Sequence, residues 1–117
     1  DLANLYGQTI RLSAPMNIGI SYLQPSSFEI GAAFPNPFNN SISIEINISN
    51  LEPIEFLVAN VLGEVVYNEK IIPLRNGIHS LTWNARNNYG QDLSSGIYFL
   101  QFNSINYQSN RKITYLK

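Results

Sequence analysis

Four isoleucines occupy every second position from Ile42 to Ile48, with polar residues Ser43, Glu45 and Asn47 between them. Successive side chains of a β-strand point to opposite faces, so this pattern predicts a strand with one buried face and one face in water. Few α-helices would tolerate such an alternation, because their period is 3.6 residues. The segment therefore makes β-structure the starting expectation for the fold.

Several shorter apolar segments point the same way. Residues 55–61 and 65–72 flank a turn at Gly63-Glu64, which indicates a β-hairpin. Three later segments also place apolar or aromatic side chains on one face, namely His79, Leu81 and Trp83, then Tyr98, Leu100 and Phe102, and finally Ile113 and Tyr115. Six or seven short strands without a helical period predict an antiparallel β-sandwich of two sheets, with a partly open barrel as the competing architecture.

The first 27 residues fit this pattern less well. Residues 9–13 and 16–22 are candidates for two further strands, and Pro25-Ser26-Ser27 is typical of a linker. Because the chain begins with Asp1, we interpret it as a piece of a longer protein. We expect residues 1–27 to be the end of a preceding domain or a linker, and residues 28–117 to be the sandwich. An extra β-hairpin that pairs with the sandwich edge is the alternative for the first segment.

Composition narrows the function. The chain of 117 residues has a net charge of −1, which disfavours the basic surface that nucleic-acid binding requires. It contains no cysteine, so a disulfide scaffold and a cysteine-ligated metal site are excluded. No run approaches the roughly 20 apolar residues of a membrane span. We therefore expect neither a nucleic-acid partner nor membrane insertion.

Catalytic residues are hard to find in this sequence. The lone histidine, His79, shares its predicted strand face with apolar residues, and Glu52 and Glu55 flank Pro53 near a loop. A metal site would need clustered oxygen ligands, and only Asp92 lies near the asparagines at 87 and 88. We therefore predict no catalytic residue, no cofactor-binding residue and no metal site, and the chain is not expected to be an enzyme.

Other residues are candidates for recognition, and each also has a structural interpretation. Pro35, Asn36 and Pro37 form a turn that either starts a strand or is read by a partner. Gly63 and Gly96 suit turns. Tyr98 is typical of a core anchor whose hydroxyl bonds nearby backbone at a sandwich corner.

The end of the chain is a local cationic segment. Arg111, Lys112 and Lys117 are three of the seven basic residues and fall in the last seven positions. Lysines on an edge strand discourage pairing with another sheet. Alternatively, a receptor reads this strand by adding a strand of its own to the edge.

The order of these motifs resembles one known family. Phe34-Pro35-Asn36-Pro37-Phe38-Asn39-Asn40-Ser41 is similar to the opening of the type A C-terminal domains that direct cargo through the type IX secretion system, although those domains usually carry Tyr and Pro where this chain has Phe34 and Asn40. Val61-Leu62-Gly63-Glu64 resembles their central turn without its arginine. Ser95-Gly96-Ile97-Tyr98-Phe99 and the basic end resemble their last two strands.

A second family shares part of this pattern. The segment Trp83-Asn84-Ala85-Arg86-Asn87 is similar to a turn in the immunoglobulin-like domain of flagellar hook-capping proteins, with Asp and Gly both replaced. The basic terminal strand favours the sorting family. Both resemblances imply an immunoglobulin-like antiparallel β-sandwich of about seven strands.

The resemblance implies a non-catalytic sorting and attachment module fused to an upstream cargo protein. Its expected partners are the outer-membrane type IX translocon and a sortase-like protease that cleaves within about residues 21–31. The expected location is the exterior or the cell surface of a Gram-negative bacterium, reached through the periplasm. The alternative function is a structural or carbohydrate-binding module of an extracellular enzyme or adhesin.

Overall fold

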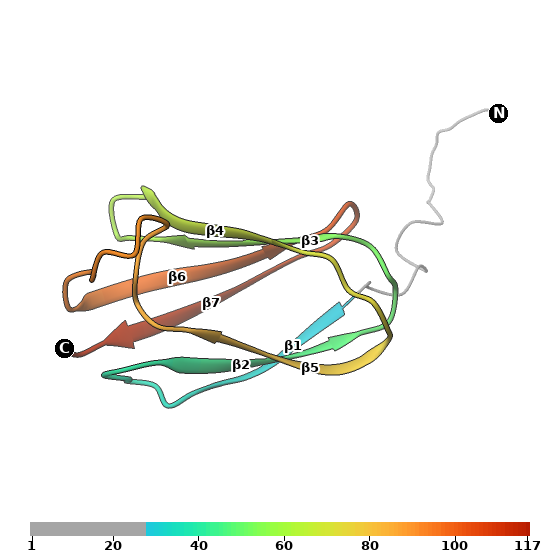
Figure 1. Cartoon of the computed structure of the whole chain (residues 1–117), viewed down its shortest axis with the longest axis horizontal. Coiled ribbons are helices and arrows are strands. Elements are labelled where there is room, and N and C mark those ends of the chain that lie inside the picture. The colour runs from blue at the N-terminus through green and yellow to red at the C-terminus, as the bar shows by residue number, and fades with distance from the viewer. Residues whose placement is uncertain (1–27) are drawn as a thin grey trace, which may run out of the picture.

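The computed structural model describes residues 28–117 of the chain (Figure 1). The strands predicted over residues 9–13 and 16–22, and the linker predicted at 25–27, lie outside the described residues. The described part contains seven strands, which are β1 (Phe28–Phe34), β2 (Ile42–Ile48), β3 (Ile54–Ala59), β4 (Val65–Ile71), β5 (Gly77–Trp83), β6 (Gly96–Asn103) and β7 (Gln108–Tyr115).

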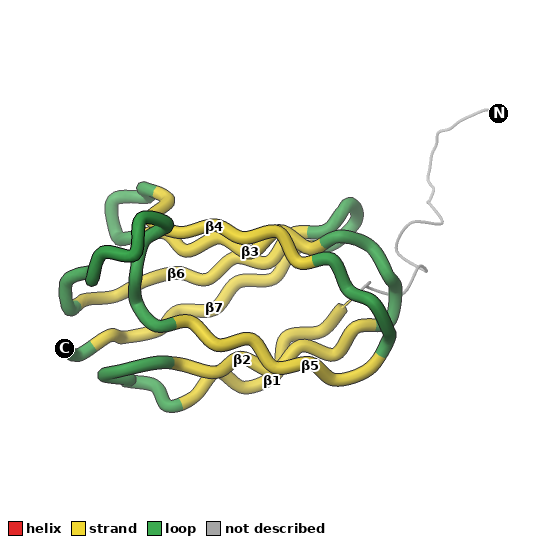
Figure 2. The backbone as a smooth tube through the Cα atoms, viewed as in Figure 1, coloured by secondary structure: helices red, strands yellow, loops and turns green. Residues whose placement is uncertain are grey.

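The strands form two antiparallel sheets that face each other, as Figure 2 shows. One sheet has the order β1-β2-β5 and the other has the order β4-β3-β6-β7. Within residues 28–117, the ladders stay inside each sheet, and the isolated bridge between Phe38 and Tyr115 is the backbone pairing that links the two. The predicted sandwich is therefore confirmed, and a barrel is not formed.

The core lies between the sheets and follows the predicted alternation. All four isoleucines of β2 are at most 2% exposed, while Glu45 and Asn47 face water. In the opposite sheet, Phe56 of β3 stacks on Phe102 of β6 with ring centroids 4.9 Å apart. Burial of such side chains removes apolar surface from water and is the main force that holds the sheets together.

The predicted strands match the observed ones with small shifts at their ends. The hairpin β3–β4 is confirmed by pairs from Ile54 with Ile71 to Ala59 with Val65. Strand β1 was not predicted, and the cleavage region expected over residues 21–31 overlaps its first four residues. Phe28 is fully buried and pairs with Ile48, so this part of the expected cleavage region belongs to the sheet.

The loops gather at two opposite ends of the sandwich (Figures 1 and 2). The proximal end holds the start of β1 together with the loops 49–53, 72–76 and 104–107. The distal end holds the loops 35–41, 60–64 and 84–95 together with the last residues of the chain. Any segment ahead of residue 28 therefore joins the sandwich at the proximal end.

Candidate recognition surface at the distal end

The Pro35-Asn36-Pro37 turn docks directly on the terminal strand. Both peptide bonds that precede its prolines are cis. The carboxamide of Asn36 donates from Nδ2 to the carbonyl of Lys112 over 3.4 Å, and its Oδ1 accepts the N–H of Thr114 over 3.0 Å. This side chain therefore bonds alternate residues of β7 as the backbone of a neighbouring strand would.

Phe38 continues the same contact. Its N–H donates to the carbonyl of Thr114 over 3.0 Å, and its carbonyl accepts the N–H of Leu116 over 2.8 Å. The Phe38 ring is 2% exposed and stacks on Tyr115 with centroids 5.0 Å apart. Asn36 and Phe38 together occupy the outer edge of β7 from Lys112 to Leu116, so a partner strand can add there only after displacing them.

The basic residues of the chain end separate into two groups. Arg111 pairs with Leu100 of β6, which is fully buried, and paired residues share a face of the sheet. Its guanidinium donates to the carbonyl of Ile30 in β1, which links the two sheets. Lys112 and Lys117 are exposed instead. Within residues 28–117 the ion pair is Arg86 with Asp92, so both lysines lack an acidic partner there.

Gly63 and Tyr98 adopt the structural roles expected of them. Gly63 has a φ of 84° in the β3–β4 turn, where the Oδ1 of Asn60 accepts the N–H groups of Leu62 and Glu64. The Tyr98 hydroxyl donates to the carbonyl of Ser94 over 2.6 Å, which confirms the predicted corner. Burial, and to a smaller extent the nearby Tyr115, raises the pKa of Tyr98.

Gly96 begins β6 and pairs with Tyr115 at the last step of the β6–β7 ladder. The residue before it, Ser95, accepts the backbone N–H of Lys117 at its Oγ over 2.8 Å. The residue just ahead of β6 therefore holds Lys117 at the distal end. All nine candidate recognition residues lie at the distal end or on the terminal strand that leads to it.

An apolar strip lies on the outer face of the four-stranded sheet at the same end. Val65, Ala59, Phe99 and Lys112 follow one another across the four strands as direct pairs. Val65 is 57% exposed and Phe99 is 41% exposed. An outward face of an antiparallel sheet is ordinarily polar, so this strip with a lysine at its end is unusual. This strip was not predicted from the sequence, because the predictions rested on the residues that face the core.

Groups capable of catalysis are dispersed in the described part of the chain. Residues 28–117 hold no group of three His, Asp or Glu side chains that suits a metal ion. The ring Nε2 of His79 shares a hydrogen bond of 3.0 Å with the carbonyl of Arg75. Asp92 pairs with Arg86 at 3.4 Å. No helix in this part is long and apolar enough to cross a membrane.

Two of the solved structures that share this fold come from Porphyromonas gingivalis. Dimeric latent PorU from Porphyromonas gingivalis is 16% identical, with a TM-score of 0.61 over 79% of this chain and 10% of that one. PorZ, a surface component of the type IX secretion system of the same bacterium, is 15% identical, with a TM-score of 0.54 over 74% of this chain and 11% of that one. This chain thus spans about a tenth of either protein. No curated protein matches it.

The family comparison covers the same seven-stranded unit. A family model described as a secretion system C-terminal sorting domain matches residues 32–115, from within β1 to the last residue of β7. This range includes the Pro35-Asn36-Pro37 turn, Gly63, Tyr98 and the contacts that hold β7. The chain therefore belongs to the family of type IX secretion C-terminal sorting domains, whose members reach the exterior or the surface of the cell.

Proposed function

We propose that residues 28–117 direct an upstream cargo protein across the outer membrane by binding the type IX translocon. The module is a recognition element without catalysis of its own. Family membership supports the sorting role. The observation that carries the proposal is the placement of the motifs, which gather at the distal end, opposite the start of β1. Cargo attached at the proximal end leaves that surface open to a receptor.

The exposed distal residues are the ones we assign to recognition. Lys112 and Lys117 offer positive charge without an ion pair in the described residues, and Phe99 offers apolar area beside Lys112. Apolar area with a charged rim is typical of protein interfaces. Asn36, Arg111 and Tyr98 act as positioning residues because their polar groups bond the module itself.

Removal of the module by a sortase-like protease completes the proposed route. The cargo passes through the periplasm of a Gram-negative bacterium and is then released or attached to surface lipopolysaccharide. Cleavage ahead of Phe28 is favoured, because Phe28 is fully buried and paired within β1. Backbone that is paired in a sheet must open before a protease can bind it. Residues 1–27 then serve as the connector to the cargo.

A secretion assay tests this function. A periplasmic reporter is fused ahead of residues 1–117 and produced in a bacterium with the type IX system, and in the same strain without its translocon. We expect the reporter outside the first strain and in the periplasm of the second. Equal periplasmic retention in both strains would contradict the sorting role. A shorter fusion that lacks residues 111–117 is a poor test, because it also removes the buried Ile113 and Tyr115.

A further inference from the structure

Two turns at the distal end have the same backbone geometry. One spans residues 60–64 between β3 and β4, and the other spans residues 87–91 within the loop 84–95. In each turn the first residue, an asparagine, donates its N–H to the carbonyl of the fifth residue over 3.0 Å. Its carbonyl accepts the N–H of the fourth residue, a glycine, also over 3.0 Å. The φ angles of the two glycines are 84° and 80°. The chain therefore builds the same turn twice.

The side chain of the first residue repeats its bonds as well. In both turns the Oδ1 of the asparagine, Asn60 or Asn87, accepts the N–H groups of the third and fifth residues over 2.9–3.0 Å. Its Nδ2 donates to the Oε1 of the fifth residue over 2.8 Å. Bonds of this kind fix a turn before a partner arrives, which lowers the entropic cost of binding.

The third residue of each turn is a large side chain that points into solvent. Leu62 is 80% exposed and Tyr89 is 88% exposed. The turn uses the backbone N–H of each residue and leaves its side chain outside the bonds listed for the turn. Apolar side chains held on a rigid loop are typical anchors of protein interfaces, and tyrosine is prominent among them. The two turns therefore present a pair of anchors at the distal end.

The fifth residue carries a charge in only one of the two turns. Glu64 and Gln91 accept the same bond from their asparagines, so the turn requires the oxygen atom and not the charge. Within residues 28–117 the ion pair is Arg86 with Asp92, so the Glu64 carboxylate has no basic partner there. This charge is therefore available to a basic group of another molecule.

A hollow of about 590 Å³ lies between the two turns. Glu64, Val65 and Tyr89 are among the residues that line it, and Val65 is 57% exposed. Asn88 fastens the second turn to β4, because its carboxamide bonds the N–H and the carbonyl of Asn68, each over 2.9 Å. The hollow is therefore held open by fixed backbone and combines apolar walls with one acidic group.

We propose that this hollow and the two turn tips bind a segment of the type IX translocon that carries a Lys or Arg between apolar side chains. The basic side chain meets Glu64, and the apolar side chains pack on Leu62 and Tyr89. Opposite charge and a few apolar anchors are what such a complementary surface requires. This inference rests on the proposed function, because it names the chemistry of the receptor surface. It adds a second contact to that of Lys112 and Lys117, which calls for acidic residues instead.

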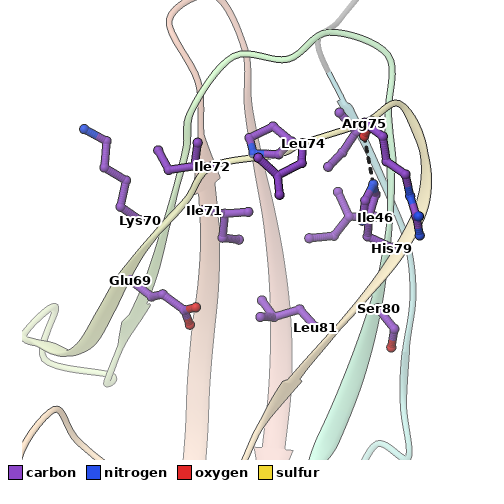
Figure 3. Close-up of a pocket in the computed structure, with 12 residues that line it drawn as sticks. Ile46, Glu69, Lys70, Ile71, Ile72, Leu74, Arg75, His79, Ser80 and Leu81 are labelled. Atoms are coloured by element: carbon purple, nitrogen blue, oxygen red, sulfur yellow. Dashed lines mark hydrogen bonds between the residues drawn. The ribbon is translucent and has the colours of Figure 1, made fainter.

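Export of the fused reporter tests the two anchors. The test variant is Leu62→Ala/Tyr89→Ala. The control, Leu74→Ala/Ile105→Ala, removes side chains of the proximal loops that are 88% and 80% exposed. Leu74 borders a cleft of about 460 Å³ between β4 and β5 (Figure 3). We expect the exported fraction to fall by about tenfold or more in the test variant and to stay at the parental level in the control. Because all four side chains are exposed, urea unfolding should give the parental midpoint for both variants.

Glu64→Gln tests the charge alone. The turn at residues 87–91 already holds a glutamine at this position, so the variant should keep its turn and its stability. We expect the exported fraction to fall by about threefold, as the loss of an exposed ion pair does. Glu55→Gln, which neutralises an exposed carboxylate of β3, is the control and should export normally. Parental export in Glu64→Gln would overturn the basic partner.

Photochemical crosslinking identifies the chemistry of the partner. A benzophenone side chain replaces Tyr89 in the exporting strain, and replaces Ile105 in the control. We expect an adduct from position 89 with a translocon subunit, at a peptide that carries Lys or Arg within a few residues of the crosslink. An adduct with a second copy of the module, an adduct at a peptide without a basic residue, or no protein adduct would overturn the proposal.

The parent chain separates failure of this inference from failure of the sorting role. Export of the parent together with equal export of both double variants would overturn the inference alone. Retention of the parent in the periplasm, with and without the translocon, would contradict the sorting role and the inference with it.

Discussion

The two long sides of the sandwich differ in how far the described residues close them. On the β1–β7 side, Asn36 and Phe38 bond the outer edge of the terminal strand β7. Arg111 of β7 donates to the carbonyl of Ile30 in the opposite sheet. On the β4–β5 side, residues 28–117 leave a cleft, and among them only β2 pairs with the backbone of β5. Two of the motifs on which the family resemblance was based, the Pro-Asn-Pro turn and the basic end, therefore lie on the side where contacts hold the two sheets together. A loss of sorting on their mutation does not by itself identify a receptor contact.

The difference in stability between the two sides should be largest for a substitution at Phe38. Phe38→Ala removes a ring that is 2% exposed and stacks on Tyr115, so the free energy of unfolding should fall by about 3–5 kcal/mol. Leu74→Ala, at the rim of the open cleft and 88% exposed, should change it by less than about 0.5 kcal/mol. Urea unfolding of both variants measures this, and similar losses of stability would refute the idea that, within residues 28–117, the β1–β7 side is the more tightly closed one.

Substitutions at Asn36 test whether its side-chain amide closes the outer edge of β7. Asn36→Ala removes both bonds to β7 and should lower the free energy of unfolding by about 1–2 kcal/mol, with faster amide exchange at Thr114. Asn36→Asp keeps an acceptor for the Thr114 N–H and should lose less. Asn88→Ala, on the β4 edge, is the matched control and should speed exchange at Asn68 instead. Unchanged exchange at Thr114 in Asn36→Ala would argue against the closure.

A substitution at Arg111 distinguishes a structural role of its guanidinium from a role of its charge in binding a receptor. Arg111→Lys keeps the charge but loses the fork of donors that reaches Ile30 and Asn110, so stability should fall by about 1 kcal/mol. Export of a fused reporter should persist at a temperature where the variant remains folded. Full stability together with lost export would reverse this assignment and make Arg111 a recognition residue.

The strands were predictable where one face alone meets the core. The isoleucines of β2 and the Tyr98, Leu100 and Phe102 face of β6 are buried as expected. β1 escaped prediction because its register shifts between Ile30 and Ala33 and only its first and third residues are buried. A period of two is lost over so short a segment.

The candidate site was predictable as a set of motifs but not as a set of contacts. Asn36 bonds residues 76 and 78 positions away, and local sequence carries no signal for such a pair. Arg111 was grouped with the two lysines by charge, whereas its place opposite Leu100 turns it toward β1. The roles of Asn60 and Asn88 were missed for the same reason, since turn-forming asparagines look alike in a sequence.

Tyr98 should produce the smallest effect, confined to alkaline solution. Burial raises its pKa above the ordinary 10.0, so the unfolded chain ionises first as the pH rises. Stability from this group is therefore complete below about pH 10 and declines as the pH rises through the pKa of the folded state. The decline should be shallower in Tyr98→Phe, though still present, because the pKa of Tyr67 is also raised. Identical alkaline slopes in both proteins would contradict this.

The central claim is that the translocon binds the exposed distal lysines, whereas the residues at the outer edge of β7 only hold these lysines in place. The direct measurement is the exported fraction of a reporter that is fused ahead of residues 1–117. The test variant is Lys112→Ala/Lys117→Ala, and the control is Lys70→Ala on the outward face of β4. All three lysines are exposed, so each variant should stay within about 0.5 kcal/mol of the parent in stability. We predict that the double variant loses export and the control keeps it. Export equal to the parent in the double variant would contradict the claim.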